Sequence, residues 1–312
     1  MIIKRRLWWY LLSGFLFGAS LVSYLVYGLP LGIDFTGGNI AEIEYQQQLT
    51  AEEVRASFQA KGVETIVQAV GEKTFSVKFK QIPNQVSQPE EGSAPKTENS
   101  TLPQAKLIGT IVGDKGKVIK FDTVGPSVSQ TLQRKALLSI LYASIGIIIY
   151  LAWAFRSAAK IASAWMFGLI AVIALIHDTT IVIGWFSILG HFFSQTITVD
   201  TYFITAILTI LGYSVNDTIV VFDRMREVAR RHPELTVEEI AIKSVYNTLG
   251  RSLNTSLTVF LVIITMLLLS GGALFSFLLA LSIGVFFGTY SSIFIAAPLL
   301  VTWHYYKLRR QR

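Results

Sequence analysis

Charge is scarce in this chain of 312 residues, and cysteine is absent from it. Charged residues make up 15% of the chain, whereas soluble domains carry about 25%. The absence of cysteine excludes disulfides, thiolate zinc sites and a cysteine nucleophile, and four histidines are few for a histidine-based metal site. No Ser/Lys, paired-aspartate or metal-ligand motif is visible either. We therefore expect a protein that is not an enzyme and that holds neither a metal nor a cofactor.

Hydrophobic residues make up 52% of the chain, and they gather in six long runs with few charges. A run of about 20 such residues matches the hydrocarbon thickness of a bilayer. The first run follows three basic residues, as a signal peptide does, but it is longer than the apolar segment of about 7–15 residues found there. We therefore expect an uncleaved anchor and an α-helical polytopic membrane protein. The six predicted transmembrane helices are 7–27, 136–155, 161–186, 201–222, 252–271 and 274–303, the last of them tilted or extended beyond the bilayer.

The connections between these runs differ in their basic residues. Residues 28–135 hold twelve Lys/Arg and twelve Asp/Glu, so the net charge of +7 lies on the membrane part. The short connections at 187–200 and 271–273 contain no Lys or Arg. By the positive-inside rule the basic segments are cytoplasmic and residues 28–135 are extracytoplasmic. This location of the charge argues against nucleic acid as a partner and for contact with membrane lipid. The cytoplasmic segments are then 1–6, 156–160, 223–250 and the tail 304–312.

Residues 28–135 predict a small α+β domain between the first and second spans. Period-two alternation, turn residues and a capping box at Thr50 and Glu53 give its elements. We expect strands at 39–45, 65–70, 73–80 and 117–124, and helices at 50–61 and within 103–113. This order favours a ferredoxin-like fold. Residues 83–106 are rich in Pro, Gln, Glu, Ser and Asn and predict a disordered insertion.

Residues 223–250 predict a helical connection in the cytoplasm. A charged helix continues the fourth span to Arg231, and Pro233 ends it. Thr236 and Glu239 form a second capping box, which starts a helix to about Leu249. The basic surface of this connection fits either attraction to anionic lipid head groups or docking of a cytoplasmic partner.

An ionisable residue at membrane depth is costly to insert and so needs a reason. Asp217 lies in the fourth span beside Asn216, with Tyr213 and Ser214 one turn before it on the same helical face. A buried carboxyl group can accept and release protons. The alternatives are a structural ion pair and a position nearer the membrane interface.

Two further polar groups lie in the spans. Arg251 opens the fifth span, and Thr255 follows at i+4, so one face of that helix is polar. Arg251 is either a cytoplasmic anchor or a partner that reaches Asp217 and holds it ionised in one state. His177 and Asp178 in the third span form either a proton relay or a polar pair that fixes helix packing.

Small residues recur every four positions in the sixth span. Such a stripe allows close approach of a neighbouring helix, either of this chain or of a partner. Gly14 and Gly18 predict the same for the first span. The stripe consists of Ser276, Ala280, Gly284, Gly288, Ser292 and Ala296.

Two runs of sequence are distinctive, GIDFTGG directly after the first span and LGYSVNDTIVVFDRMRE at 211–227. The first is similar to a signature shared by SecD and SecF of the bacterial protein-export machinery, and the second resembles the fourth-span motif of the SecF family. His177–Asp178, RSLNTS at 251–256 and GTYSSIFIAAP at 288–298 fit its third, fifth and sixth spans. The resemblance covers nearly the whole chain. The signature positions are Gly32, Asp34, Gly37 and Gly38.

The resemblance implies a function in the bacterial plasma (inner) membrane. Members of the family, which are similar to resistance-nodulation-division transporters, pair with SecD and use the proton motive force to promote late steps of Sec-dependent protein translocation. An acidic residue of the fourth span and an arginine of the fifth serve proton movement there. The candidate proton-coupling residues are then Asp217, Arg251, Asp178, His177, Asn216 and Thr255.

The resemblance also implies partners. These are SecD, the SecYEG translocon, the SecA motor and the exported unfolded polypeptide, with YajC and YidC as further candidates. The proton gradient takes the place of a cofactor as the energy source.

Two other functions compete with this interpretation. An exporter of small molecules or lipids usually carries two six-span halves and two large outer domains in one chain, and this chain has one half and one modest domain. A passive scaffold of the translocon predicts that replacing Asp217 leaves export intact.

Overall fold

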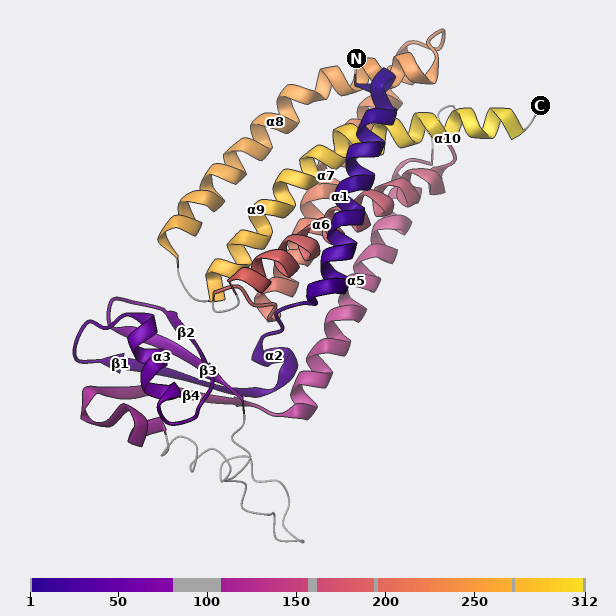
Figure 1. Ribbon diagram of the computed structural model, residues 1–312. Coiled ribbons are helices and arrows are strands. Elements are labelled where there is room, and N and C mark those ends of the chain that lie inside the picture. The colour runs from indigo at the N-terminus through magenta and orange to yellow at the C-terminus, as the bar shows by residue number, and fades with distance from the viewer. Residues whose placement is uncertain (1, 81–107, 157–161, 194–195, 271–272, 311–312) are drawn as a thin grey trace.

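Six helices of the described chain, residues 2–80, 108–156, 162–193, 196–270 and 273–310, are long and apolar enough to cross a membrane. In this computed structural model they form one bundle, and both termini lie at the end of the bundle opposite the α+β domain (Figure 1). The predicted six-span fold is confirmed. The helices are α1 (Arg6–Tyr27), α5 (Pro126–Ala154), α6 (Ala164–Phe192), α7 (Thr201–Arg231), α8 (Val237–Leu269) and α9 (Ala273–Ser291), the last continued through a π-helical turn (Ser292–Ala296) into α10 (Ala297–Arg310).

Several helices are longer than the hydrophobic runs that predicted them. Helix α5 begins at Pro126, ten residues before the expected span and inside the range 28–135. Proline at the first helical position is favourable because its missing N–H would have no partner there. Helix α8 begins at the Thr236 capping box and continues without a break to Leu269, so the cytoplasmic helix and the fifth span are one element.

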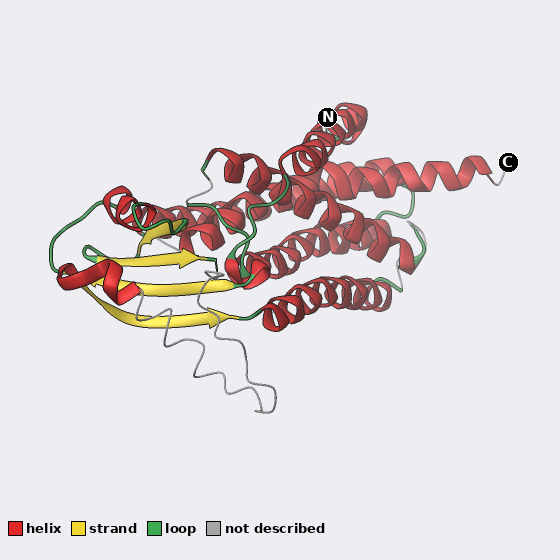
Figure 2. Ribbon diagram, turned by 60° about the horizontal axis from the view of Figure 1, so that its bottom comes forward, coloured by secondary structure: helices red, strands yellow, loops and turns green. Residues whose placement is uncertain are grey.

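The α+β domain has the ferredoxin-like topology that its sequence predicts. Its antiparallel sheet has the order β2-β3-β1-β4, and Figure 2 shows it beside one end of the bundle. Val54 and Phe58 from α3 pack on the sheet, as does Ile108 from the helical residues 108–112. The predicted insertion 83–106 lies outside the described residues. The elements are β1 (Gly38–Tyr45), α3 (Ala51–Gln59), β2 (Thr65–Ala69), β3 (Thr74–Phe79) and β4 (Gly116–Val124).

Helix α1 is polar on its buried face and apolar on its exposed face. Its buried residues are Ser13, Ser20 and Ser23, which suits a helix whose outer face meets lipid and whose inner face packs through small residues. A Cβ added to Gly184 of α6 would overlap Ser20, whereas Gly14 and Gly18 have no neighbouring atom within 4 Å of such a position. The close approach of this helix therefore uses serines rather than its two glycines.

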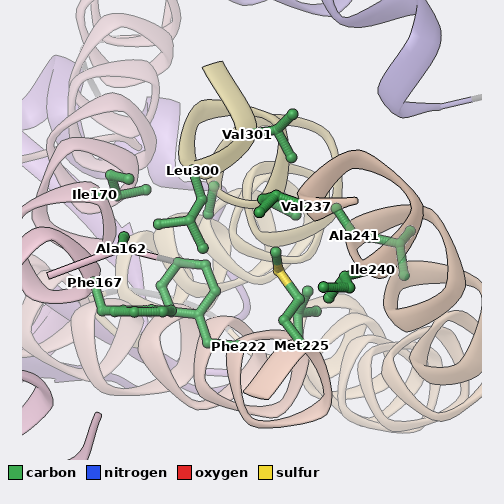
Figure 3. Packing of buried hydrophobic residues seen from close by; sticks show 14 of the residues in the cluster. Ala162, Phe167, Ile170, Phe222, Met225, Val237, Ile240, Ala241, Leu300 and Val301 are labelled. Carbon is green, nitrogen blue, oxygen red and sulfur yellow. The ribbon is translucent and has the colours of Figure 1, made fainter. Parts of the chain in front are cut away.

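A hydrophobic core at the terminus end of the bundle joins α5, α6, α7, α8 and α10. Figure 3 shows Phe167 of α6, Phe222 and Met225 of α7, Ile240 of α8 and Leu300 of α10 pointing toward one another. The rings of Phe167 and Phe222 pack edge to face with centroids 5.2 Å apart, a favourable arrangement for aromatic pairs. This core fixes the terminus end of α7 in place.

The small-residue stripe of α9 packs against α7 of the same chain. A Cβ on Gly284 would overlap the side chain of Ile210, and one on Gly288 would lie 3.0 Å from the Cβ of Ser214. One turn further, the hydroxyls of Ser292 and Thr218 are hydrogen-bonded at 2.8 Å. The contact brings the two backbones close together and sets the distance between α7 and α9.

We expect Gly284→Ala to destabilise the bundle, because the added methyl group meets Ile210 at a close contact. Overpacking of this kind costs about 1–3 kcal/mol. The measurement is the midpoint of thermal unfolding of the purified protein in detergent. Gly146→Ala on α5 is the matched control, since a Cβ there has no neighbour within 4 Å. Equal midpoints for the two variants would contradict the tight α7–α9 contact.

Candidate functional site

Two carboxyl groups are buried inside the membrane bundle. Asp178 of α6 is fully buried, and Asp217 of α7 is 4% exposed. Helix α7 packs against α5, α6, α8 and α9, so it lies between the elements that surround both groups. Among the described residues, no group of three or more His, Cys, Asp or Glu could hold a metal ion.

Hydroxyl groups from three helices surround Asp217. The Ser256 hydroxyl of α8 donates to Asp217 Oδ2 at 3.4 Å. Tyr213 of α7 donates to Ser256 Oγ at 3.0 Å, and Ser256 is also hydrogen-bonded to Thr289 of α9. Because a hydroxyl both donates and accepts, this set can reorient when the carboxyl gains or loses a proton.

Asp178 has a denser set of partners. Its Oδ1 lies 3.0 Å from His177 Nδ1, and its Oδ2 accepts hydrogen bonds from Ser214 at 2.8 Å and Ser291 at 2.7 Å. Ser214 lies on α7 one turn before Asp217, so the two buried carboxyl groups meet the same stretch of that helix. His177 Nε2 is buried without a hydrogen-bond partner in the described structure. The arrangement fits both interpretations of the pair, a relay and a packing device.

Arg251 does not meet Asp217 in this structure. It is exposed, and no ion pair between the two is present among the described residues. Ser252 and Ser256 of α8 are buried, whereas Arg251 lies one position away from this face, about 100° around the helix. Thr255 is exposed as well, and its hydroxyl donates to the Arg251 carbonyl at 2.9 Å.

An exposed polar stripe runs along α7 and α8. Asn216 is exposed beside the buried Asp217, and the exposed Thr209 and Thr205 precede it by about two and three turns of α7. The threonine hydroxyls donate to carbonyls three or four residues earlier in the same helix. The exposed Asn216 side chain lies in a hydrophobic span, where lipid offers no hydrogen-bond partner. The sequence analysis missed this stripe on α7, although the four-residue spacing of its threonines is a detectable signal. The stripe consists of Thr205, Thr209 and Asn216 on α7 and of Arg251, Asn254, Thr255 and Thr258 on α8.

The GIDFTGG segment lies at the other end of the bundle, where the α+β domain meets α7. It forms a single helical turn, α2 (Ile33–Thr36), followed by Gly37 and Gly38 with φ of 77° and 152°. Glycine suits such positive angles. A Cβ on Gly38 would also lie 2.7 Å from the Phe79 carbonyl oxygen. The Asp34 carboxylate accepts a hydrogen bond from the backbone N–H of Thr201, the first residue of α7, at 2.9 Å.

Two family models match the chain. The model described as protein export membrane protein SecD/SecF, C-terminal, matches residues 105–306. The SecD/SecF GG motif matches residues 24–49, which include GIDFTGG.

Curated relatives and a solved structure extend this likeness over nearly the whole chain. The protein translocase subunit SecF of Thermobaculum terrenum is 36% identical over 305 residues, which cover 97% of this chain and 93% of that protein. The protein translocase subunit SecDF of Bacillus subtilis is 34% identical over 314 residues, 98% of this chain and 38% of that protein. The crystal structure of SecDF, a translocon-associated membrane protein from Thermus thermophilus, superposes with a TM-score of 0.75 at 30% identity, over 96% of this chain and 38% of that one.

Replacing Asp178 separates the two interpretations of the buried pair. Asp178→Leu leaves three donors without their acceptor, and each such loss costs about 1–3 kcal/mol in a buried setting. Asp178→Asn keeps one acceptor oxygen. If the group fixes packing, the thermal midpoint in detergent falls for Asp178→Leu and falls less for Asp178→Asn. Wild-type midpoints for both variants would exclude a packing role.

Proposed function

The chain belongs to the SecD/SecF family of protein export membrane proteins, and from this premise we propose that it uses the proton motive force, together with SecD, to promote late steps of Sec-dependent protein translocation. Its role in protein translocation follows from relatives that are named protein translocase subunits. The observation that carries the finer proposal is the buried carboxyl of Asp217, surrounded by hydroxyls of α7, α8 and α9.

A carboxyl group buried in the membrane can couple proton uptake and release to a change in the arrangement of the helices. Its charged form is costly in a bilayer, so a change in protonation changes which helix arrangement is favoured. One charge crossing 100 mV of membrane potential yields about 2.3 kcal/mol. That is enough to shift the populations of two states that are close in free energy.

Arg251 acts in this proposal as a mobile partner of Asp217. Its exposed position on α8 leaves it free of an ion pair among the described residues. A rotation of α8 that brings the Arg251 face toward α7 would pair the two groups and hold Asp217 ionised. The state described here is then the one in which they are apart. Asp178 and His177 supply a second candidate proton-holding group, which meets α7 at Ser214, one turn before Asp217.

The proposed orientation follows the basic residues. Lys4 and Arg5 lie at the terminus end of the bundle, as do Lys307, Arg309 and Arg310 at the end of α10. The positive-inside rule assigns that end to the cytoplasm of a bacterium and the α+β domain to the outside of its plasma membrane. There the domain would meet the exported polypeptide as it leaves SecYEG, while SecA acts on the other side. YajC and YidC are further candidates for neighbours.

SecD is the proposed cover of the polar stripe on α7 and α8. The SecDF relatives carry a SecF-like part, matched by this chain, within a longer chain, which supports an association with SecD. Asn216 and Arg251 are exposed within hydrophobic spans, and a second membrane protein can supply the hydrogen-bond partners that lipid lacks. The proposed interface therefore lies along these two helices.

Asp217→Asn is expected to abolish the part of export that depends on the proton gradient, because an amide cannot take up and release a proton. The measurement is completion of export of a secreted protein in proteoliposomes with SecYEG, SecA and SecD, with and without a gradient. Asp223→Asn on the same helix is the matched control, since Asp223 is exposed and pairs with Arg226. Gradient-dependent export that survives in Asp217→Asn, with normal membrane insertion, would favour the scaffold interpretation.

A photo-crosslinker tests the proposed SecD interface. The chain has no cysteine, so Thr209→Cys gives a single site for a benzophenone label on the polar stripe. We expect this label to cross-link to SecD after co-reconstitution and illumination. Phe15→Cys, on the exposed apolar face of α1, is the control and is expected to react with lipid only. Equal cross-linking from both positions would argue against an interface at α7 and α8.

A further inference from the structure

The GIDFTGG segment holds the loop that leads into α7. The backbone N–H of Gly32 donates to the Val199 carbonyl at 2.8 Å, and the N–H of Val199 donates to the Pro30 carbonyl at 2.8 Å. Leu31 and Val199 thus form a parallel β-bridge. A Cβ on Gly32 would lie 3.2 Å from both Asp200 Cβ and the Val199 carbonyl oxygen, so the approach leaves little room for a side chain.

Two carboxylates then cap the first turn of α7. Asp200 is the helix cap, and its Oδ1 accepts from the Phe203 N–H at 3.0 Å. Asp34 accepts from the Thr201 N–H at 2.9 Å. These N–H groups have no partner within the helix, and negative charge at a helix N-terminus is favourable. Asp200, directly before the helix, therefore supplies one cap, and Asp34 in the segment that leads into the α+β domain supplies the other.

The charges at this junction act on one another. Burial raises the pKa of the Asp200 carboxyl, and the nearby negative charge of Asp34 raises it further, whereas the Phe203 N–H and the positive charge of Lys78 lower it. Lys78 is a buried residue of β3. The sheet and the GIDFTGG segment thus both contribute charge to the start of α7.

The segment that carries Asp34 is attached both to the helix bundle and to the sheet of the α+β domain. Phe35 packs among Phe186 of α6 and Phe203 of α7, and its carbonyl accepts a hydrogen bond from the Gln133 side chain of α5 at 2.6 Å. Gly38 begins β1, an inner strand of the sheet. A tilt of the domain about the bundle must therefore pull on this short segment.

Helix α7 is continuous from this junction to the buried carboxyl. It runs from Thr201 to Arg231 without a proline, and Asp217 lies 16 residues after Thr201, about 24 Å along the axis at 1.5 Å per residue. An unbroken helix moves largely as one body. A shift of α7 at Asp217 therefore reaches Thr201, and with it Asp34.

We propose that Asp34 is a positioning residue that couples the protonation state of Asp217 to the orientation of the α+β domain, through its hydrogen bond to the first N–H of α7. The inference rests on the proposed function and adds to it a role for Asp34. When α7 moves on proton exchange at Asp217, the hydrogen bond to Asp34 transmits this movement to the α+β domain. Because coupling is reciprocal, a force on the domain also changes which position of α7 is favoured.

Two variants remove this hydrogen bond from opposite sides. Asp34→Ala deletes the acceptor. Thr201→Pro deletes the donor and keeps the helix, because proline is favourable at the first helical position and Asp200 before it is already extended, with φ −128° and ψ −170°. In the reconstituted export assay both are expected to lose most of the gradient-stimulated component and to keep the gradient-independent one. Thr201→Ala, which retains the N–H, and Asp34→Asn, which retains an acceptor oxygen, are expected to keep most of it.

The same assay separates failure of this inference from failure of the proposed function. If Asp217→Asn loses the gradient-stimulated component while Asp34→Ala and Thr201→Pro keep it, the coupling role of Asp34 is overturned and the proposed function stands. If Asp217→Asn keeps that component, the proposed function fails, and the inference fails with it.

A distance measurement excludes a merely structural role. Spin labels at Val70→Cys in the domain and Leu268→Cys near the end of α8, both exposed positions, report the orientation of the domain by pulsed electron resonance. We expect Asp217→Asn to shift this distance distribution when Asp34 is present and to leave it unchanged in the Asp34→Ala background. An equal shift in both backgrounds would overturn the proposal, because the domain would then follow α7 without Asp34.

Discussion

A bilayer offers no hydrogen-bond partner to a group in its core, and the arrangement of this bundle depends on that constraint. Helix α1 turns Ser13, Ser20 and Ser23 inward and its large apolar residues outward. The two buried carboxyl groups draw hydroxyls from α7, α8 and α9. Helix α7 meets both sets of hydroxyls, because it packs against α5, α6, α8 and α9.

The fold could be predicted because its signals are local in the sequence. The hydrophobic runs gave the six spans, the boxes at Thr50 and Thr236 gave two helix starts that the structure confirms, and the order of strands and helices gave the topology of the domain. Helix ends outside the membrane were harder to predict. The first turns of α5 hold polar residues, which carry no hydrophobic signal, although Pro126 after Gly125 is a typical helix start.

The candidate site could be predicted only in part. Asp217 and Asp178 stand out because a carboxyl within an apolar run is rare. Their partners do not, since serine and threonine are ordinary residues of membrane helices, and only the fold selects Ser256 and Ser291 from among them. Arg251 shows the limit of spacing as a guide. It precedes Ser252 by one residue, and that single step turns its side chain away from α7.

Both ends of α7 are held by contacts with neighbouring elements. At the terminus end, Phe222 and Met225 are enclosed by side chains of α6, α8 and α10, and a close-packed core of this kind resists small displacements. At the domain end, the first turn is capped by Asp34 and Asp200, and Phe203 packs in a cluster with Phe35 and with Phe186 of α6. Large apolar side chains therefore hold both halves of the helix, and polar caps are added at the domain end. Asp217 lies between the two clusters, so a change of charge there acts on a helix that is anchored at both ends.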